Sequence, residues 1–364
     1  MPKIVLAMSG GVDSSVAAAM LQRAGHEVTG LFMRHGVTSG ENACSSPRDE
    51  ADAAAVAEKL GIPFHVVSFE SEFQKVVAYF VETYLAGRTP NPCAVCNAKI
   101  KFGKIVEFAD TLGAEFIATG HYARIGVSEL RMGVDAGKDQ SYVLFGIRRE
   151  LLPRLMFPVG EFRKAEIRQI AEEIGLSVAK KRDSQEICFV PDKDHAKFIE
   201  EYTACRQPAG EFITTDGKIV GSHEGLAKYT IGQRKGLGLA FGSPRYVVRL
   251  EPETNRVVLG MYEELAQSSL EAADANWLIP PPTEPFSCEV KIRYRTPAVA
   301  ATVFPGEDGS TFRVEFASPI HGIAPGQAAV CYQGERLLGG GFILESVECG
   351  EWSDKKTTPL STLG

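Results

Sequence analysis

The residues best suited to chemistry come early in the chain, in the run Ser9-Gly10-Gly11-Val12-Asp13-Ser14-Ser15. Paired glycines let a backbone approach an anion closely. If a helix follows, its N-terminus offers unpaired N–H groups and the positive end of the helix dipole to that anion. The serine hydroxyls add donors, and Asp13 is a candidate ligand for Mg²⁺. The run therefore predicts a phosphate site, against the plainer alternative of a glycine turn with a serine or aspartate cap.

The same run lacks a lysine. In the G-x-x-x-x-G-K-[ST] loop a lysine reaches the outer phosphates of the nucleotide. Without one, we expect attack at the α-phosphorus with pyrophosphate as the leaving group, rather than transfer of the γ-phosphate.

Cysteines supply the second set of reactive groups. Among eight cysteines, Cys93 and Cys96 form the one close pair. Cys96 precedes Asn97, which we predict to be the N-cap of a helix starting near Ala98. A helix N-terminus favours an adjacent anion by roughly 1 to 2 kcal/mol in partly buried geometry, so Cys96 is expected to be an activated thiol.

A metal offers another use for these thiols. Cys93, Cys96 and Cys188 are enough for a [4Fe–4S] cluster with one open iron. A structural zinc is a weaker alternative, because no fourth ligand is evident near them.

The elements that must position these groups alternate between strands and helices in the first half. Short apolar runs predict strands, and helical spacing with caps predicts helices. Such alternation indicates a doubly wound α/β domain with a parallel sheet. We expect strands at 4–8, 28–33, 64–69 and 115–119, and helices at 14–24, 49–60, 72–85, 98–112 and around 167–174.

The pattern changes after about residue 192. A hairpin is expected at 246–250 and 256–259, and Pro280-Pro281-Pro282 marks a linker or loop. Regularly spaced short strands then predict a small β-barrel. These strands are expected at 287–294, 298–304, 311–316, 328–332 and 337–344.

Composition narrows the class of protein. Hydrophobic residues make up 44% and charged residues 23%, which suits a globular chain with a real core. No apolar run approaches the length of a membrane helix, and no secretory signal is evident, so we expect a cytoplasmic protein with no membrane association.

The net charge of −7 does not announce a nucleic-acid partner, so that partner must be argued from local clusters. Residues 226–250 carry five basic and no acidic side chains. Lys291, Arg293 and Arg295 alternate along a predicted strand and would share one face. Such runs favour phosphate contacts, although a solvated face is the commoner meaning of a charge run.

Several motifs together resemble a known family. The run S-G-G-x-D-S is similar to the PP-loop of N-type ATP pyrophosphatases. Further motifs resemble the bacterial tRNA-specific 2-thiouridylases, in the family's order and over nearly the whole chain: residues 87–97 (GRTPNPCAVCN), 118–124 (ATGHYAR), 138–142 (KDQSY), 183–189 (DSQEICF) and 230–236 (TIGQRKG).

The resemblance implies an architecture and an activity. It implies a PP-loop catalytic domain at 1–200, a central tRNA-contacting domain at 201–272 and a C-terminal β-barrel at 273–364. It also implies that the enzyme uses ATP and Mg²⁺ to adenylate the C2 carbonyl of the wobble uridine in tRNA. Sulfur then replaces the oxygen, giving 2-thiouridine, AMP and pyrophosphate.

The resemblance also implies roles for residues at matching positions. Cys188 would receive a persulfide from a sulfur-carrier protein, and Cys96 would act as the nucleophile that releases the sulfur, closing a Cys96–Cys188 disulfide. Asp13 would take part in catalysis. ATP would contact Ala7, Met8, Ser9, Gly10, Gly11, Val12, Asp13, Ser14, Met33 and Gly120. The tRNA anticodon arm would contact Asn91, Pro92, Cys93, Lys138, Asp139, Gln140, Arg293 and Tyr294, with His121 and Gln327 contributing to selectivity.

Alternatives remain open at this stage. Many family members have aspartate where this chain has Cys93, so thiolation could depend on the cluster rather than on a persulfide. Met33 could equally be a methionine of the core rather than an ATP contact. His121 could equally be a hydrogen-bonded structural histidine. The rival functions are a PP-loop ligase resembling NAD or GMP synthetase, and an RNA-binding module with a degenerate nucleotide site. We expect a monomer.

Overall fold

A parallel sheet forms the centre of the N-terminal part of the computed structural model, which describes residues 1–36, 46–181, 187–190 and 194–346. Its five strands follow the order β3-β2-β1-β4-β7, and every neighbouring pair is parallel. The strands are β1 (Lys3–Ala7), β2 (Glu27–Arg34), β3 (Phe64–Ser68), β4 (Phe116–Thr119) and β7 (Leu155–Met156).

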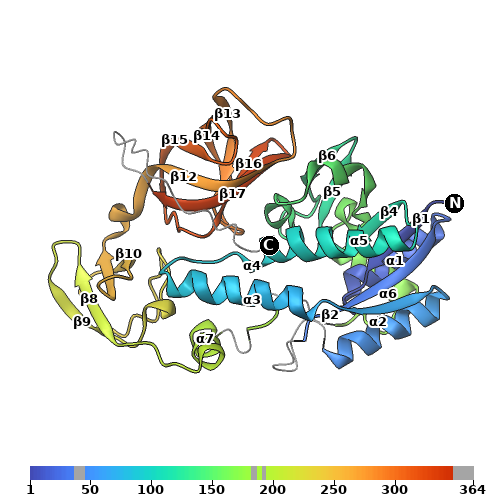
Figure 1. The fold of residues 1–364 in the computed structure, drawn as a ribbon, viewed down its shortest axis with the longest axis horizontal. Helices are drawn as coiled ribbons and strands as arrows, with labels where there is room; N and C mark the ends of the chain where they lie inside the picture. The colour runs from blue at the N-terminus through green and yellow to red at the C-terminus, as the bar shows by residue number, and fades with distance from the viewer. Residues whose placement is uncertain (37–45, 182–186, 191–193, 347–364) are drawn as a thin grey trace.

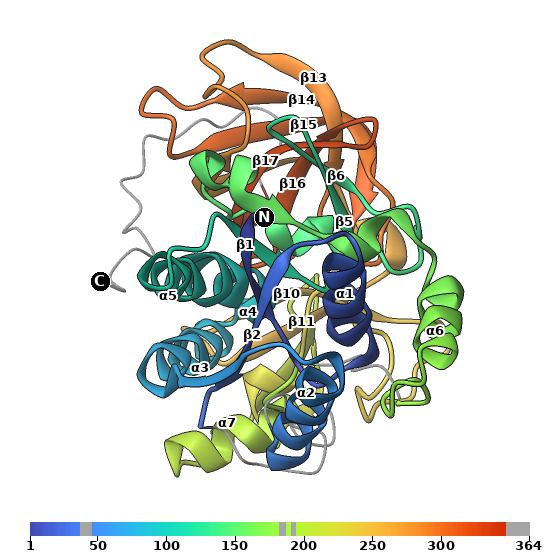
Figure 2. The same cartoon turned by 90° about the vertical axis from the view of Figure 1, so that its right-hand side faces the viewer.

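Helices cover both faces of this sheet because successive strand residues point to opposite sides. Ile4 and Leu6 of β1 pack with helices α1 (Val12–Arg23), α2 (Pro47–Leu60) and α6 (Lys164–Glu173), whereas Val5 packs on the other face. That face carries α3 (Glu70–Leu85), α4 (Pro92–Cys96), a π-helical segment η1 (Asn97–Lys104) and α5 (Ile105–Thr111). The expected doubly wound α/β fold is confirmed (Figure 2).

Smaller elements complete this part of the chain. A hairpin of β5 (Ala123–Gly126) and β6 (Glu129–Met132) follows β4. Short 3₁₀ helices lie at η2 (Ser141–Leu144), η3 (Arg149–Arg154) and η4 (Pro158–Glu161), and α7 (His195–Thr203) leads into the next unit.

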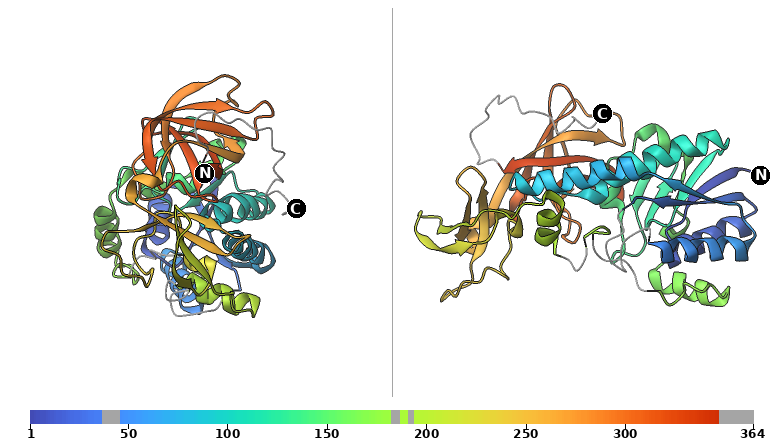
Figure 3. Two further views of the ribbon diagram at one scale, coloured as in Figure 1. Left: turned by 90° about the vertical axis from the view of Figure 1, so that its left-hand side faces the viewer. Right: turned by 60° about the horizontal axis from the view of Figure 1, so that its bottom comes forward.

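The central unit is a four-stranded sheet in the order β10-β11-β8-β9. Its strands are β8 (Gly210–Thr214), β9 (Ile219–His223), β10 (Tyr246–Glu251) and β11 (Arg256–Gly260), with 3₁₀ helices η6 (Leu226–Lys228) and η7 (Tyr262–Leu265). The predicted hairpin is confirmed as the antiparallel pair β10 and β11. Helix α3 runs from the parallel sheet to this unit, where Gly87, two residues after its end, lies against Pro252 and Leu226 (Figures 1 and 3).

The C-terminal strands form the expected β-barrel. Six strands follow the order β12-β15-β14-β13-β16-β17, and β17 pairs with β12 to close the ring. They are β12 (Ala266–Trp277), β13 (Phe286–Lys291), β14 (Val299–Pro305), β15 (Phe312–His321), β16 (Ala328–Gln333) and β17 (Arg336–Ser346). Within the ranges described, no helix is both long and apolar enough to cross a bilayer.

Three features differ from the sequence-based expectations. The long strand β12 was not predicted, and the proposed boundary at residue 272 falls inside it. The β5–β6 hairpin was also missed, and it extends the barrel sheet by pairing with β17, at Arg131 opposite Arg336. The helix expected at 98–112 is instead the π-helical segment η1 followed by α5, and Phe102 within η1 has a non-helical backbone conformation.

Candidate active site

The predicted phosphate loop lies between β1 and α1, at the carboxyl edge of the sheet where ligands of doubly wound folds bind. Gly10 has a φ of +70°, and a Cβ on it would lie 2.1 Å from the carbonyl oxygen of Asp49. Gly11 is the N-cap of α1, and Ser15 Oγ donates to its carbonyl at 2.8 Å. The N–H groups in the first turn of α1 have no acceptor within the helix, so they are available to bind an anion.

The neighbouring residues of the loop differ in what they expose. Met8 and Val12 are buried, with 2% and 3% of their surfaces accessible, so a nucleotide here would meet their backbones. Ser9 is exposed, and its backbone N–H donates to Ser14 Oγ at 3.2 Å. Ala7 ends β1 beside them.

A lysine absent from the loop sequence is supplied by a distant helix. Lys164, the first residue of α6, donates to both carboxylate oxygens of Asp13 at 2.8 Å. The phenol of Tyr122 donates to Asp13 Oδ1 at 2.7 Å. The loop is therefore free of lysine only in its local sequence, and Asp13 is held by a cation and a phenol in the folded chain.

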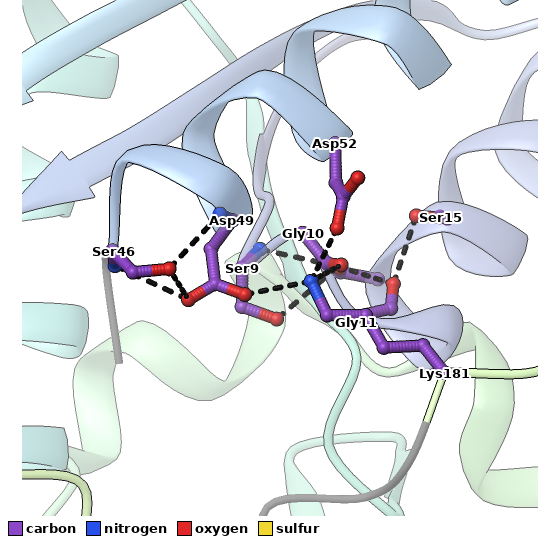
Figure 4. A network of polar contacts seen from close by, with 9 residues as sticks. Ser9, Gly10, Gly11, Ser15, Ser46, Asp49, Asp52 and Lys181 are labelled. Carbon is purple, nitrogen blue, oxygen red and sulfur yellow. Dashed lines mark hydrogen bonds and ion pairs between the residues drawn. The ribbon is translucent and has the colours of Figure 1, made fainter. Parts of the chain in front are cut away.

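A second lysine reaches the other side of the loop. Lys181 donates to the carbonyl oxygen of Gly10 at 2.9 Å and to Asp49 Oδ1 at 2.6 Å, and it also hydrogen bonds to Asp52 (Figure 4). Asp49 uses its other oxygen to accept from the N–H and hydroxyl of Ser46, the N-cap of α2. This network joins the phosphate loop to α2.

Two more predicted nucleotide residues lie near the same edge. Gly120 follows β4, and a Cβ on it would lie 2.7 Å from the backbone nitrogen of Ser14. A side chain at position 120 would thus collide with the start of α1. This packing alone explains why the residue is glycine, whether or not a ligand binds there. Met33, next to the last residue of β2, is half-buried and packs against the core on the α3 face.

His121 is buried between the rings of Phe102 and Phe157, and both of its ring nitrogens have polar neighbours. Its Nδ1 lies 2.7 Å from Thr119 Oγ1, and its Nε2 lies 3.5 Å from Lys101 Nζ. Burial and, less strongly, the Lys101 charge hold the pKa of His121 well below its usual value. The ring is therefore neutral near pH 7, which favours an orienting role over proton transfer to a substrate.

The helix that carries Cys96 begins earlier than predicted. Asn91 is the N-cap, with its Oδ1 accepting from the N–H of Ala94 at 3.2 Å, and Pro92 is the first helical residue. The prediction of Asn97 as N-cap is wrong: Asn97 continues the helical path, buried, and donates to the carbonyl of Val143 at 3.0 Å.

This start changes which thiol the helix dipole favours. Cys93 is the second residue of the helix and exposed, whereas Cys96 is its last residue and half-buried. The dipole acts within the first turn, so it favours a thiolate at Cys93 more than at Cys96. Three residues apart, the two side chains share one face of the helix.

Cys188 lies on a short segment that packs against α3. The neighbouring ring of Phe189 meets Phe73 and Phe80 of α3 edge to face, at centroid distances of 5.6 and 5.0 Å. Cys188 and Cys96 are both half-buried against the same apolar core, on the face of the sheet that carries α3. Residues 183–186 of the same motif fall outside the described ranges.

An iron–sulfur cluster held by these thiols would need three of them close together. In the parts of the chain that are described, which include Cys93, Cys96 and Cys188, no three cysteine, histidine or acidic side chains gather as metal ligands.

Lys291 and Tyr294 of the barrel lie beside the ring of Tyr142, which belongs to η2, and η2 packs against the cysteine helix α4. Lys291 Nζ lies 5.9 Å from the ring centre of Tyr142 and 5.8 Å from that of Tyr294. Burial, and then the charge of Asp139, raise the pKa of Tyr294, although the charge of Arg295 acts in the opposite direction. A ring exposed by 39%, as Tyr294 is, beside a cation suits the stacking of an unpaired base.

The expectation that Lys291, Arg293 and Arg295 alternate along one strand is wrong. Strand β13 ends at Lys291, and Thr296 closes a turn by hydrogen bonding to the carbonyl of Arg293. Arg293 donates to the carbonyls of Gly322 and Ile231, at 2.8 and 2.7 Å, and so ties the barrel to the central unit.

Residues 138–140 were predicted to contact tRNA, but two of their side chains point into the protein. Asp139 is buried and accepts from the N–H groups of Gly133 and Ser141 at 3.0 and 3.1 Å. Gln140 accepts from the N–H of Tyr122 at 3.0 Å. Lys138 is half-buried in the turn before them.

Gln327 links the barrel to the loop that precedes the cysteine helix. Its Nε2 donates to the carbonyls of Pro90 and Thr89, at 2.8 and 3.3 Å. The N–H of Thr89 donates to the carbonyl of Pro325 at 2.8 Å. Gln327 thus fixes the position from which Asn91, Pro92 and Cys93 are presented.

Sequence reasoning missed the roles of Lys164, Lys181 and Tyr122 as partners of the phosphate loop. No local pattern marks a lysine as the partner of a loop about 150 residues away. Asn91 could have been found, because asparagine followed by proline is a typical N-cap and first helical residue.

A glycine-rich loop at the carboxyl edge of a parallel sheet is typical of HUP-type nucleotide-binding domains. These features therefore place the chain in that class of protein. Three family descriptions match the chain: "tRNA methyl transferase HUP domain" at residues 2–192, "tRNA methyl transferase PRC-barrel domain" at 196–261 and "Aminomethyltransferase beta-barrel domain" at 267–343.

The family follows from full-length relatives. The chain is 47% identical over 393 residues to the tRNA-specific 2-thiouridylase MnmA of Rhodopirellula baltica, covering 96% of this chain and 98% of that one. It is 47% identical over 355 residues to the enzyme of the same name from Geobacter metallireducens, covering 94% and 96%. The chain belongs to the tRNA-specific 2-thiouridylase family, as its motifs indicated.

Proposed function

We infer that this chain is an ATP-dependent sulfurtransferase that thiolates uridine in tRNA. One observation carries this conclusion: the phosphate loop and the Cys93–Cys96 helix lie at the same parallel sheet, and the barrel places the aromatic and basic residues Tyr294 and Lys291 near that helix. The full-length relatives bear the same activity in their names. The ligase alternative would leave the paired cysteines and the barrel surface without a use.

The first step is activation of the uridine C2 carbonyl. The first turn of α1 holds the phosphates of ATP, and the uridine oxygen attacks the α-phosphorus, releasing pyrophosphate. Asp13 has a side chain exposed by 29% and is the carboxylate of this loop, so it fits a Mg²⁺ that arrives with ATP. Lys164, already bonded to Asp13, adds positive charge where negative charge develops.

The second step transfers sulfur. The terminal sulfur of a Cys188 persulfide attacks C2, and AMP leaves with the oxygen. The Cys96 thiolate then attacks the Cys188 sulfur and breaks the S–S bond, which leaves sulfur on C2 and forms a Cys96–Cys188 disulfide. An external dithiol must reduce this disulfide before the next turnover.

Recognition of the wobble uridine falls to the Asn91-Pro92-Cys93 segment and the barrel. The base leaves its stack and lies between Cys93 and Tyr294, with Lys291 beside it, while the anticodon arm follows the barrel. Asp139 and Gln140 stabilise the loop behind this surface, and any contact they make with tRNA runs through their backbones. The enzyme acts as a cytoplasmic monomer that receives sulfur from a carrier protein.

Pyrophosphate release tests the proposal directly. Wild-type protein with ATP and unmodified tRNA is expected to release pyrophosphate, and release without tRNA would instead indicate a ligase. Asp13→Asn should abolish it. Cys96→Ser and Cys188→Ser should stop 2-thiouridine formation while ATP binding stays, and Cys205→Ser is the matched control because Cys205 is exposed in a different part of the chain.

The role of iron needs its own measurement. Protein purified without air is expected to be colourless, free of iron and active with a persulfide donor. Activity that follows iron content in parallel with visible absorption would contradict the persulfide mechanism.

A further inference from the structure

Lys181 is the cation whose contacts the proposed reaction leaves unexplained. Its ammonium group lies between the phosphate loop and α2, where it reaches one carbonyl and two carboxylates, those of Gly10, Asp49 and Asp52 (Figure 4). The side chain is 27% exposed. Lys181 stands seven positions before Cys188, on the chain that leads to the sulfur-carrying residue.

The contact with Gly10 fixes a peptide plane. In a trans peptide the carbonyl of one residue and the N–H of the next point in opposite directions. Since the Gly10 carbonyl points to Lys181 and α2, the N–H of Gly11 points away from them. Gly10 adopts a φ of +70° and has the carbonyl of Asp49 against it, so glycine alone fits this plane without strain.

The contacts with Asp49 and Asp52 also set the charge beside the loop. Two carboxylates there carry two negative charges, and one ammonium balances one of them. Burial lowers the pKa of Lys181, but the hydrogen bonds that it donates to Asp49 and Asp52 outweigh this and raise it, so the lysine stays charged at neutral pH. Without it, both carboxylates would repel an incoming triphosphate.

We propose that Lys181 is a positioning residue for ATP: it orients the Gly10–Gly11 peptide for phosphate binding and balances one of the two negative charges on the α2 carboxylates. The inference rests on the proposed function, since it assumes that the loop binds ATP. It assigns to the segment leading to Cys188 a part in nucleotide binding as well as in sulfur transfer.

The test is ATP affinity by calorimetry on the full-length protein, with the affinity for unmodified tRNA measured beside it. Lys181→Met is expected to raise the Kd for ATP about tenfold or more, since a hydrogen bond to a charged group contributes about 1.5 kcal/mol or more. Its Kd for tRNA should stay within about twofold of wild type, because the tRNA surface lies on other elements. Lys181→Arg should recover most of the ATP affinity.

Two further variants separate this role from a merely structural one. Asp52→Asn removes a negative charge near the phosphates, so it should tighten ATP binding about twofold, whereas loss of a structural contact would weaken it. Lys180→Met is the matched control, because Lys180 is the neighbouring lysine and is exposed; its ATP affinity should equal that of wild type.

Each result has a defined meaning. Equal ATP affinity of Lys181→Met and wild type overturns the inference. If Lys181→Met does not fold, the ATP affinity of Asp52→Asn decides the matter. Unchanged or weaker ATP binding by Asp52→Asn then overturns the inference, and tighter binding supports it. Wild-type protein that binds no ATP overturns the proposed function itself, and the inference with it.

Discussion

Removing the ammonium group that holds Asp13 should cost measurable stability. Lys164→Met deletes two charge-assisted hydrogen bonds of 2.8 Å. The side chains of Lys164 and Asp13 are 11% and 29% exposed, between a buried pair, whose disruption costs about 3 to 5 kcal/mol, and an exposed pair worth about 0.2 to 1. We therefore expect about 2 kcal/mol of destabilisation.

A double-mutant cycle measures this interaction. Thermal unfolding of wild type, Lys164→Met, Asp13→Asn and the double variant should give a coupling free energy of about 2 kcal/mol. The single Lys164→Met change should lower the Tm of the catalytic domain by about 4 to 8 °C, from the usual 2 to 4 °C per kcal/mol at this size. Lys180→Met, at an exposed position, should leave the Tm unchanged.

The cycle also shows how the reasoning would fail. If the two single changes add without coupling, Lys164 and Asp13 do not interact in solution. The folded loop would then be without this lysine, and the role assigned to Lys164 in activating the carbonyl would have to be withdrawn.

Three further outcomes are expected. Gln327→Ala removes two hydrogen bonds to the carbonyls of Thr89 and Pro90, so kcat/KM for tRNA should fall several-fold while the Kd for ATP stays constant; an equal loss in both would contradict a local role. Gly120→Ala places a Cβ 2.7 Å from the nitrogen of Ser14, so the KM for ATP should rise in a pyrophosphate assay, and an unchanged KM would show that α1 yields easily. Because burial depresses the pKa of His121, the folded protein resists protonation that the unfolded chain accepts below about pH 6.5. Unfolding experiments should show stability falling between pH 7 and 5, and His121→Asn should reduce that fall; an identical pH profile in the variant would exclude His121 as its source.

Local sequence rules were enough for much of the fold. Short apolar runs bounded by glycine predicted β1 and the α/β alternation, because buried parallel strands need apolar residues on both faces. The glycines and serines of the phosphate loop were visible because the backbone at a strand-to-helix turn depends on residues next to one another. The hairpin β10–β11 and five of the barrel strands were visible for the same reason.

Local rules failed where two readings competed. Asn91 and Asn97 are both good caps, and Pro92, which suits the first turn of a helix, marks the true start. Strand β12 lacks a clear alternation of apolar and polar residues, and its pairing with β15 and β17 decides its extent.

The amino-acid order by itself determined that an anion loop opens the chain and that cysteines follow it at set positions. Only the tertiary structure decided how the loop is charged and held. It brings Lys164 and Lys181 to Asp13 and Gly10 across 151 and 171 positions, and it turns the side chains of Asp139 and Gln140 inward. The physical reason is that an ion pair depends on distance in space, which folding sets, while caps and strand periodicity depend on distance along the chain.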